Sequence, residues 1–340
     1  MNKFLENDLS LESQWRSLIQ FGKNSATYKF AFAKALLELS GNKSIITLSD
    51  ISEPFSRNIT EHLLQNDKQG NSNSSTFLNE CRKFNQKEID KNRLLFQTEK
   101  LGFVNVVDAF QNINGSVIPD KFYEKNYSKG KKEIILTDNF FKLCESNQFS
   151  NLSLESEARW SLVETAWNLK LNPNMIVSFD ESNKLLYIND FSMKRVDITT
   201  ARNALNGYQK GKCFYSFIDL NINEKLNCDV DHVLPHLNKF AHYHSKYPTD
   251  INGVWNLVLS DKGINRNDKR AKYPDKKYME RLHKRNEYYI NSKHPLAETI
   301  INQTGNTVDE RLNFLNFHWN LSKENCIVEF STEEFSENKF

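Results

Sequence analysis

Apolar residues recur at helical spacing over residues 11–40, in "LESQWRSLIQFGKNSATYKFAFAKALLELS". The interruption near Gly22 predicts two amphipathic helices, each with one face in a core. A second helical pattern covers residues 153–171, with Ser153 as a candidate N-cap. Between these patterns, "GFVNVVDAF" and "KKEIILTD" favour strands and "NFFKLCES" favours a short helix. Residues 1–150 therefore read as a mainly helical domain, either a helical bundle with a small hairpin or a winged-helix variant.

Shorter apolar runs dominate the second half of the chain. "MIVSFDESNKLLYI" predicts two strands joined by a polar turn, and "ITTARNALNGYQKG" predicts a helix that begins after Thr199 or Thr200 and ends at Gly207 or Gly211. "CDVDHVLP" and "GVWNLVLSD" then read as two strands, and "KGINRNDKRAKY" opens a polar, basic helix. We therefore predict an α+β fold with two domains, 1–150 and 151–340, which suits a chain of 340 residues.

The net charge of the chain is only +2, so any attraction for nucleic acid must come from a local patch. Cations gather after the second of these strands, and basic side chains can hold phosphates without reading sequence. The alternative is an ordinary solvated helix face. The residues predicted to bind nucleic acid are Lys262, Arg266, Lys269, Arg270 and Lys272.

Cysteine usage and hydropathy indicate the compartment. The five cysteines are scattered and odd in number, which argues against a disulfide framework and for a reducing environment. The first residues carry acids without an apolar run, and no 18-residue apolar stretch suggests a membrane span. We therefore expect a cytoplasmic protein without a membrane partner.

The stretch "CDVDHVLPHL" places Asp231 and His232 side by side in an apolar strand, where an ionisable group is costly without a partner or a metal. The next strand carries Asn256, and Asn265 follows nine residues later, where a helix opens. In this order and spacing, "DVDHVLP" and "WNLVLSDKGINRNDK" resemble the HNH endonucleases, the ββα-metal nuclease superfamily. "YPDKKYMERLHKRNEYYINSKHPL" resembles the tail of a bacterial HNH group. The resemblance covers residues 196–300.

The resemblance implies a role for each motif residue. His232 would be the general base and Asn256 would hold the catalytic loop through backbone hydrogen bonds. Asp231 and Asn265 would be oxygen ligands of one Mg²⁺ or Mn²⁺ ion per site. Side chains alternate along a strand, so the strand and its loop must bend for Asp231 and His232 to reach one phosphate. The expected reaction is metal-dependent hydrolysis of DNA that leaves 5′-phosphate and 3′-hydroxyl ends.

The chain departs from the family pattern at two places. Many HNH proteins bind a structural zinc with two Cys-x-x-Cys pairs, but the four corresponding positions here are Cys213, Ser216, Asp261 and Ile264. We therefore expect no structural zinc, with apolar packing in its place. The lysine that commonly follows the last Asn by three residues is replaced by Asp268, with Lys269 next. Asn267 therefore remains an alternative to Asn265.

Two further histidines, His242 and His244, have a spacing that could bind a metal. Their polar, aromatic surroundings instead favour side chains that face solvent or touch phosphate. For His232, the competing interpretation is a core histidine satisfied by hydrogen bonds.

The resemblance and the two-part layout suggest a bacterial restriction or anti-phage nuclease. Its N-terminal domain would recognise DNA, regulate the nuclease or bind a partner, and a companion defence protein or a homodimer is plausible. The alternatives are a mobile-element or homing nuclease, and a nucleic-acid-binding module with a degenerate site.

Overall fold

The computed structural model describes residues 3–21, 26–41, 43–70, 75–113, 115–128, 130–169, 176–189, 194–220, 227–337 and 340. The chain divides into two compact units, unit 1 (Met1–Trp160) and unit 2 (Ser161–Phe340). Helix α8 (Phe149–Leu169) begins near the predicted boundary at residue 150 and continues across the division. Ser153 therefore lies inside this helix and is not its N-cap.

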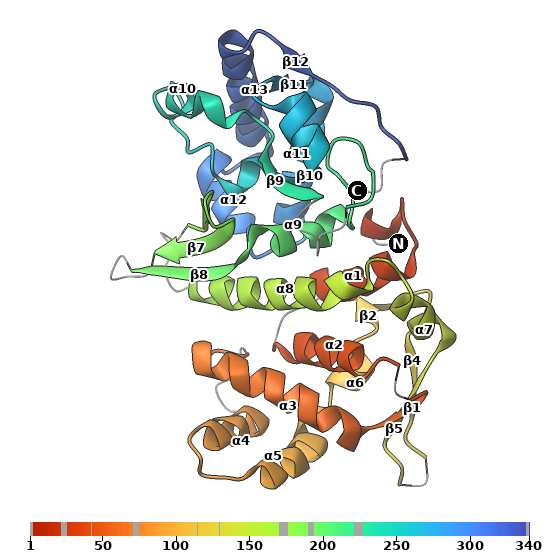
Figure 1. Ribbon diagram of the computed structural model, residues 1–340. Helices are drawn as coiled ribbons and strands as arrows, with labels where there is room; N and C mark the ends of the chain where they lie inside the picture. Colours follow the sequence, from red (N-terminus) through yellow and green to blue (C-terminus); the bar gives the residue numbers. More distant parts are fainter. Residues whose placement is uncertain are drawn as a thin grey trace. The chain divides into compact units, whose positions relative to one another are not determined.

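Unit 1 consists mainly of helices (Figure 1). Its helical elements are η1 (Lys3–Leu5), α1 (Leu11–Gln20), α2 (Tyr28–Glu38), α3 (Leu48–Gln65), α4 (Thr76–Asn85), α5 (Lys91–Gln97), η2 (Thr98–Gly102), α6 (Val106–Ala109) and α7 (Asp138–Cys144). Its strands are β1 (Ile45–Thr47), β2 (Asn112–Ile113), β3 (Ser116–Val117), β4 (Tyr123–Asn126) and β5 (Glu133–Leu136). β1, β5 and β4 form one antiparallel sheet in that order, and β2 pairs with β3.

Aromatic side chains fill the core of unit 1. The ring of Trp15 lies 5.1 Å from that of Phe122 and 5.5 Å from that of Phe110. The predicted pair of helices over residues 11–40 is confirmed as α1 and α2. Gly22, where the pattern breaks, lies outside the described residues.

The predicted strand "GFVNVVDAF" is wrong, because this stretch contains the end of η2 and the short helix α6. Its buried apolar residues are Phe103, Val106, Val107 and Phe110. These positions follow the i, i+3, i+4, i+7 spacing of a helix. The valines suggested a strand through their β propensity, but the spacing of the buried positions is the better guide here.

Unit 2 combines two small antiparallel sheets with helices. Its strands are β6 (Ser178–Asp180), β7 (Leu185–Asn189), β8 (Arg195–Thr200), β9 (Cys228–His232), β10 (Leu257–Asp261), β11 (Tyr273–Pro274) and β12 (Glu329–Phe330). Its helical elements are α9 (Ala201–Gln209), η3 (His236–Asn238), α10 (Lys239–Tyr243), η4 (Val254–Asn256), η5 (Ile264–Lys269), α11 (Lys276–Asn291), α12 (Ala297–Thr304) and α13 (Val308–Asn325).

Capping and turn residues set the bounds of α9. The side chain of Thr200 accepts a hydrogen bond from the Asn203 N–H, so the N-cap is Thr200 and not Thr199. Lys210 and Gly211 follow the helix at positive φ, and glycine adopts that conformation without steric cost. Of the two glycines that the sequence offered, Gly211 therefore marks the end of α9.

Strands β9 and β10 pair antiparallel, and the short helix η5 follows β10 directly. His232 lies opposite Leu257 in this pair, and Asp231 lies opposite Val258. Both strands contribute to one continuous core with α9 and α11. The strand–strand–helix order predicted from the sequence is present, and the mixture of helices and antiparallel strands agrees with an α+β chain.

Among the described residues, no helix combines the length and the apolar character needed to span a membrane.

Candidate functional site

The carboxylate of Asp231 is buried in strand β9, where two polar partners satisfy it. The hydroxyl of Tyr215 donates to Asp231 Oδ2 at 2.6 Å, and the ammonium of Lys269 lies 3.2 Å from the same oxygen. Burial, and secondarily the charge of Asp231, raises the pKa of Tyr215 well above its ordinary value, so the phenol keeps its proton. The negative charge of Asp231 is therefore held in place by one neutral donor and one cation.

His232 follows Asp231 and is also buried. Its Nε2 lies 2.8 Å from Asn252 Oδ1, and because an amide oxygen only accepts, the ring carries its proton on Nε2. Burial, and to a lesser degree His236, lowers the pKa of His232 to about 4. The ring is thus neutral at pH 7 with a lone pair on Nδ1, although it is less basic than the near-neutral value expected from the sequence.

Asn256 ties the loop that follows β9 to the start of β10. Its Oδ1 accepts the N–H of Leu234 at 2.8 Å, and its Nδ2 donates to the carbonyls of Leu234 at 3.2 Å and Ile251 at 3.0 Å. The backbone carbonyl of Asn256 also accepts the N–H of Val233 at 2.9 Å. These are backbone contacts of the kind that the resemblance implied for this residue.

Arg285 of α11 supports the same loop from within the core. It is buried, and it donates to the carbonyls of Trp255 at 2.9 Å and Leu257 at 3.1 Å, on either side of Asn256. Burial lowers the pKa of its guanidinium. Arg285 is therefore a structural residue of this loop.

A cavity of about 220 Å³ brings most of the predicted motif together. Asp231, His232 and Asn265 line it, with Lys269 and Arg270 from the end of η5 and the residue after it. Asn267 does not line this cavity; it contributes to another one. Of the two asparagines that the sequence left open, Asn265 is therefore the one placed with Asp231.

The donors in this cavity suit a hard divalent cation. Asp231 offers a carboxylate and Asn265 an amide oxygen, which are ligand types that Mg²⁺ and Mn²⁺ accept while keeping several waters. Within the part of the chain that the structure describes, no group of three or more His, Cys, Asp or Glu side chains could hold a metal. A cation here would depend on Asp231, Asn265 and water, and it would compete with Lys269 for the Asp231 carboxylate.

The predicted basic residues have different environments. Lys269, expected among the cations on the surface, is 1% exposed, and it also donates to the carbonyl of His232 at 2.7 Å. Arg266 is exposed and forms two hydrogen bonds with Asp229, at 2.7 and 3.1 Å. Arg270 is exposed at the cavity wall, and Lys272 is partly buried. The patch is thus smaller than the sequence suggested.

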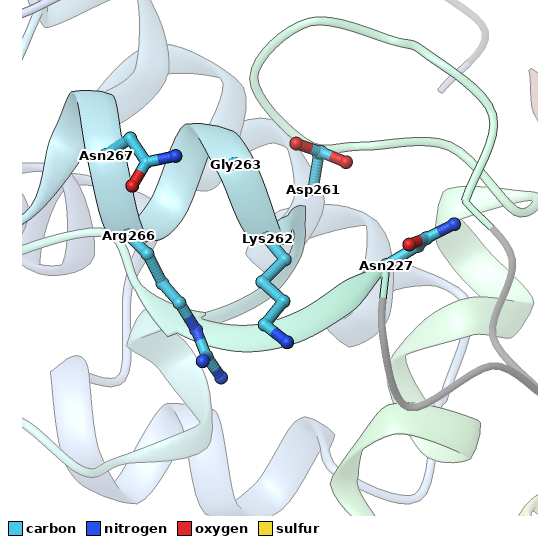
Figure 2. Close-up of a pocket in the computed structure, with 6 residues that line it drawn as sticks. All are labelled: Asn227, Asp261, Lys262, Gly263, Arg266 and Asn267. Atoms are coloured by element: carbon cyan, nitrogen blue, oxygen red, sulfur yellow. The ribbon is translucent and has the colours of Figure 1, made fainter.

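A second cavity, of about 310 Å³, lies at the beginning of η5. Figure 2 shows Lys262 and Arg266 extending in the same direction from this segment, with the Asp261 carboxylate on another side. Asp261 caps the segment, because its Oδ1 accepts the N–H of Ile264 at 3.1 Å. The partly buried Lys262 and the exposed Arg266 therefore border this second cavity, whereas Asn265 and Lys269 of the same segment line the first.

Three of the positions that correspond to zinc ligands in many HNH proteins, Cys213, Asp261 and Ile264, take part in a hydrogen bond or in apolar packing. The thiol of Cys213 is buried and accepts the N–H of Asp261 at 3.4 Å. Phe214 and Ile264 are buried in the same core.

Sequence reasoning missed Tyr215 and Asn252 as parts of the site. Tyr215 precedes Asp231 by sixteen residues and Asn252 follows His232 by twenty, so no local pattern joins them to the motif. Tyr215 lies in "KCFYSF", between the two positions, Cys213 and Ser216, that correspond to a zinc-binding pair in many HNH proteins. The sequence did contain one indication: a tyrosine in an apolar run is expected to be buried, and its hydroxyl then needs a hydrogen-bond partner.

The chain was compared with protein-family models, with curated proteins and with solved structures, and these comparisons give no match.

Proposed function

We propose that this chain is a metal-dependent endonuclease of the HNH type that hydrolyses DNA phosphodiester bonds. The observation that carries the proposal is the shared cavity of Asp231, His232 and Asn265, three residues brought together from β9 and η5. The backbone contacts of Asn256 and Arg285 support it further, because they hold the loop that connects the two strands.

Each residue has a chemical task in this proposal. Asp231 and Asn265 hold one Mg²⁺ or Mn²⁺ ion, which when bound neutralises charge on the phosphate and helps the 3′ oxygen to depart. His232 accepts the proton of the attacking water at Nδ1, since Nε2 is engaged with Asn252. Arg270 and Lys184, which also line the cavity, bind the phosphates beside the cut bond.

The biological role is a further part of the proposal. A restriction or anti-phage nuclease needs a part that recognises DNA or a partner, and unit 1 has a core of its own to support such a surface. Gene neighbourhood would separate this role from a mobile-element or homing nuclease.

One observation favours a second candidate, a nucleic-acid-binding module that does not cut. Lys269 lies against the carboxylate that would bind the metal, and an ammonium can neutralise that carboxylate permanently. In that case the cations would still hold DNA, but no metal would bind at Asp231.

Cleavage of supercoiled plasmid separates the two candidates. The full chain is incubated with plasmid and Mg²⁺ or Mn²⁺, with EDTA as the metal-free control, beside His232→Ala and the matched variant His283→Ala, whose histidine lies on α11 and does not line the cavity. We expect wild type and His283→Ala to nick the plasmid and His232→Ala to lose at least about a hundredfold in rate. Binding without metal-dependent nicking by wild type would reject the nuclease.

A further inference from the structure

The segment after strand β9 turns its apolar side chains outward. Leu237, Phe240 and Tyr243, spaced three residues apart across η3 and α10, are 75%, 73% and 63% exposed. Asn238 and His242, four residues apart, are buried instead. The usual amphipathic arrangement is reversed here, because the polar residues face the protein and the apolar residues face solvent.

Polar contacts on the inward face hold this segment against α13. His242 Nδ1 lies 2.8 Å from His318 Nδ1, and His242 Nε2 lies 3.1 Å from Ser322 Oγ. Asn238 Nδ2 donates to the thiol of Cys326 at 3.0 Å. The outward position of Phe240 and Tyr243 is thus a consequence of specific inward bonds. The sequence suggested that His242 faces solvent in a loop, but in the structure it is buried and forms two of these inward contacts.

The segment that carries the exposed residues begins at the candidate nuclease cavity. Leu237 lines that cavity together with His232 and His236. In Figure 1, α10 lies at the edge of unit 2, and the side chains of Phe240 and Tyr243 on it are exposed.

The charge of the segment is suited to a polyanion. Residues 233–249 contain no Asp or Glu, and they include Lys239 and Lys246, both exposed. A carboxylate from another segment, Glu181, also lines the cavity and lies 3.1 Å from His236 Nε2. Exposed aromatic rings among cations are the pattern that binds single-stranded nucleic acid, with bases on the rings and phosphates at the cations.

We propose that Phe240 and Tyr243 form a stacking surface for unpaired bases of the strand whose phosphate enters the cavity. This inference rests on the proposed function and specifies its substrate: a single strand or a locally unpaired stretch of DNA. Leu237 contacts the base nearest the cavity, and Lys239 and Lys246 bind the flanking phosphates. A protein partner is less favoured, because such an interface gains little from a segment whose charges are all positive.

The test measures binding under conditions where cleavage cannot occur. The full chain in EDTA is titrated against a fluorescein-labelled oligodeoxythymidylate and against an abasic strand of equal length, which keeps the phosphates and lacks the bases. We expect the strand with bases to bind about tenfold more tightly, since stacking on an aromatic residue contributes about five- to 150-fold per base.

Variants locate the effect. Phe240→Ala with Tyr243→Ala should weaken binding of the strand with bases about tenfold and leave binding of the abasic strand unchanged. Phe240→Trp should retain wild-type affinity, because it keeps an aromatic face. Phe335→Ala removes another exposed aromatic ring of unit 2 and should change neither affinity.

Three results would overturn the inference: unchanged binding by the double alanine variant, equal weakening for both strands, or a loss of self-association in light scattering without a change in DNA affinity. The last would assign the surface to a second copy of this chain. Plasmid nicking by the same preparations keeps the two claims apart. If the protein binds the strand with bases more tightly but does not nick plasmid, only the nuclease proposal is rejected. If it nicks plasmid but binds both strands equally, only the stacking surface is rejected.

Discussion

Lys269 illustrates how one side chain changes role between sequence and structure. In the sequence it belongs to a run of cations and is expected on the surface. In the structure its ammonium lies between the Asp231 carboxylate and the carbonyl of His232. A buried carboxylate requires a compensating charge, and Lys269 supplies it.

Replacing Lys269 with methionine should leave the buried Asp231 charge without a compensating cation and lower the free energy of unfolding by about 3–5 kcal/mol. Mn²⁺ should raise the melting temperature of this variant more than that of wild type, because the metal no longer competes with the ammonium. Thermal unfolding with and without Mn²⁺ measures both effects. Lys272→Met, which removes a cation outside the cavity lining, is the control. Equal metal shifts for Lys269→Met and wild type would mean that no cation binds at Asp231.

At the scale of helices and strands, the sequence predicted most of the elements that carry the site. β9, β10 and the helical segment after them follow from short apolar runs and a polar, basic turn. The prediction failed at residues 102–110, where β-branched residues occur at helical spacing. For these residues, the helical spacing of the apolar positions was therefore a better guide to secondary structure than the strand preference of valine.

One buried ion pair in unit 1 makes the packing of two helices testable. Arg16 of α1 donates to both carboxylate oxygens of Glu155 of α8 at 2.8 Å, and both residues are buried. Arg16→Met should cost about 3–5 kcal/mol of unfolding free energy, because it removes the guanidinium that compensates the buried Glu155 carboxylate. Arg16→Met combined with Glu155→Met should recover most of this loss in urea unfolding. If the double variant is as unstable as the sum of the single ones, the pair does not act as a unit.

The contact between α10 and α13 should weaken in acid. Burial lowers the pKa of His242 to about 4 and that of His318 to about 3, from an ordinary value of 6.5. The unfolded chain therefore takes up protons first, so the stability due to this pair is complete above pH 6.5 and is lost as the pH falls toward 4. The melting temperature of wild type should fall more steeply over this range than that of His318→Gln. Parallel curves for the two proteins would show that the pair does not titrate in this way.

At the scale of the whole molecule, the sequence predicted a mainly helical first part, a mixed second part and the residues that meet in one cavity. It could not predict the partners of Asp231 and His232. Tyr215 and Asn252 come from distant loops, and only tertiary packing brings them to the motif. It also overestimated the basic surface, because Lys269 is buried inside the protein.

The rate of metal-dependent plasmid nicking by Asn265→Ala and Asn267→Ala tests the central claim most directly. The two asparagines are two residues apart on one helical segment, but Asn265 shares the cavity with Asp231 and His232, and Asn267 does not. We expect Asn265→Ala to lose at least about tenfold in rate, as a lost ligand does, and to recover partly at high Mn²⁺, whereas Asn267→Ala stays close to wild type. Equal rates for the two variants, or no metal-dependent nicking by wild type, would contradict a nuclease site at this cavity.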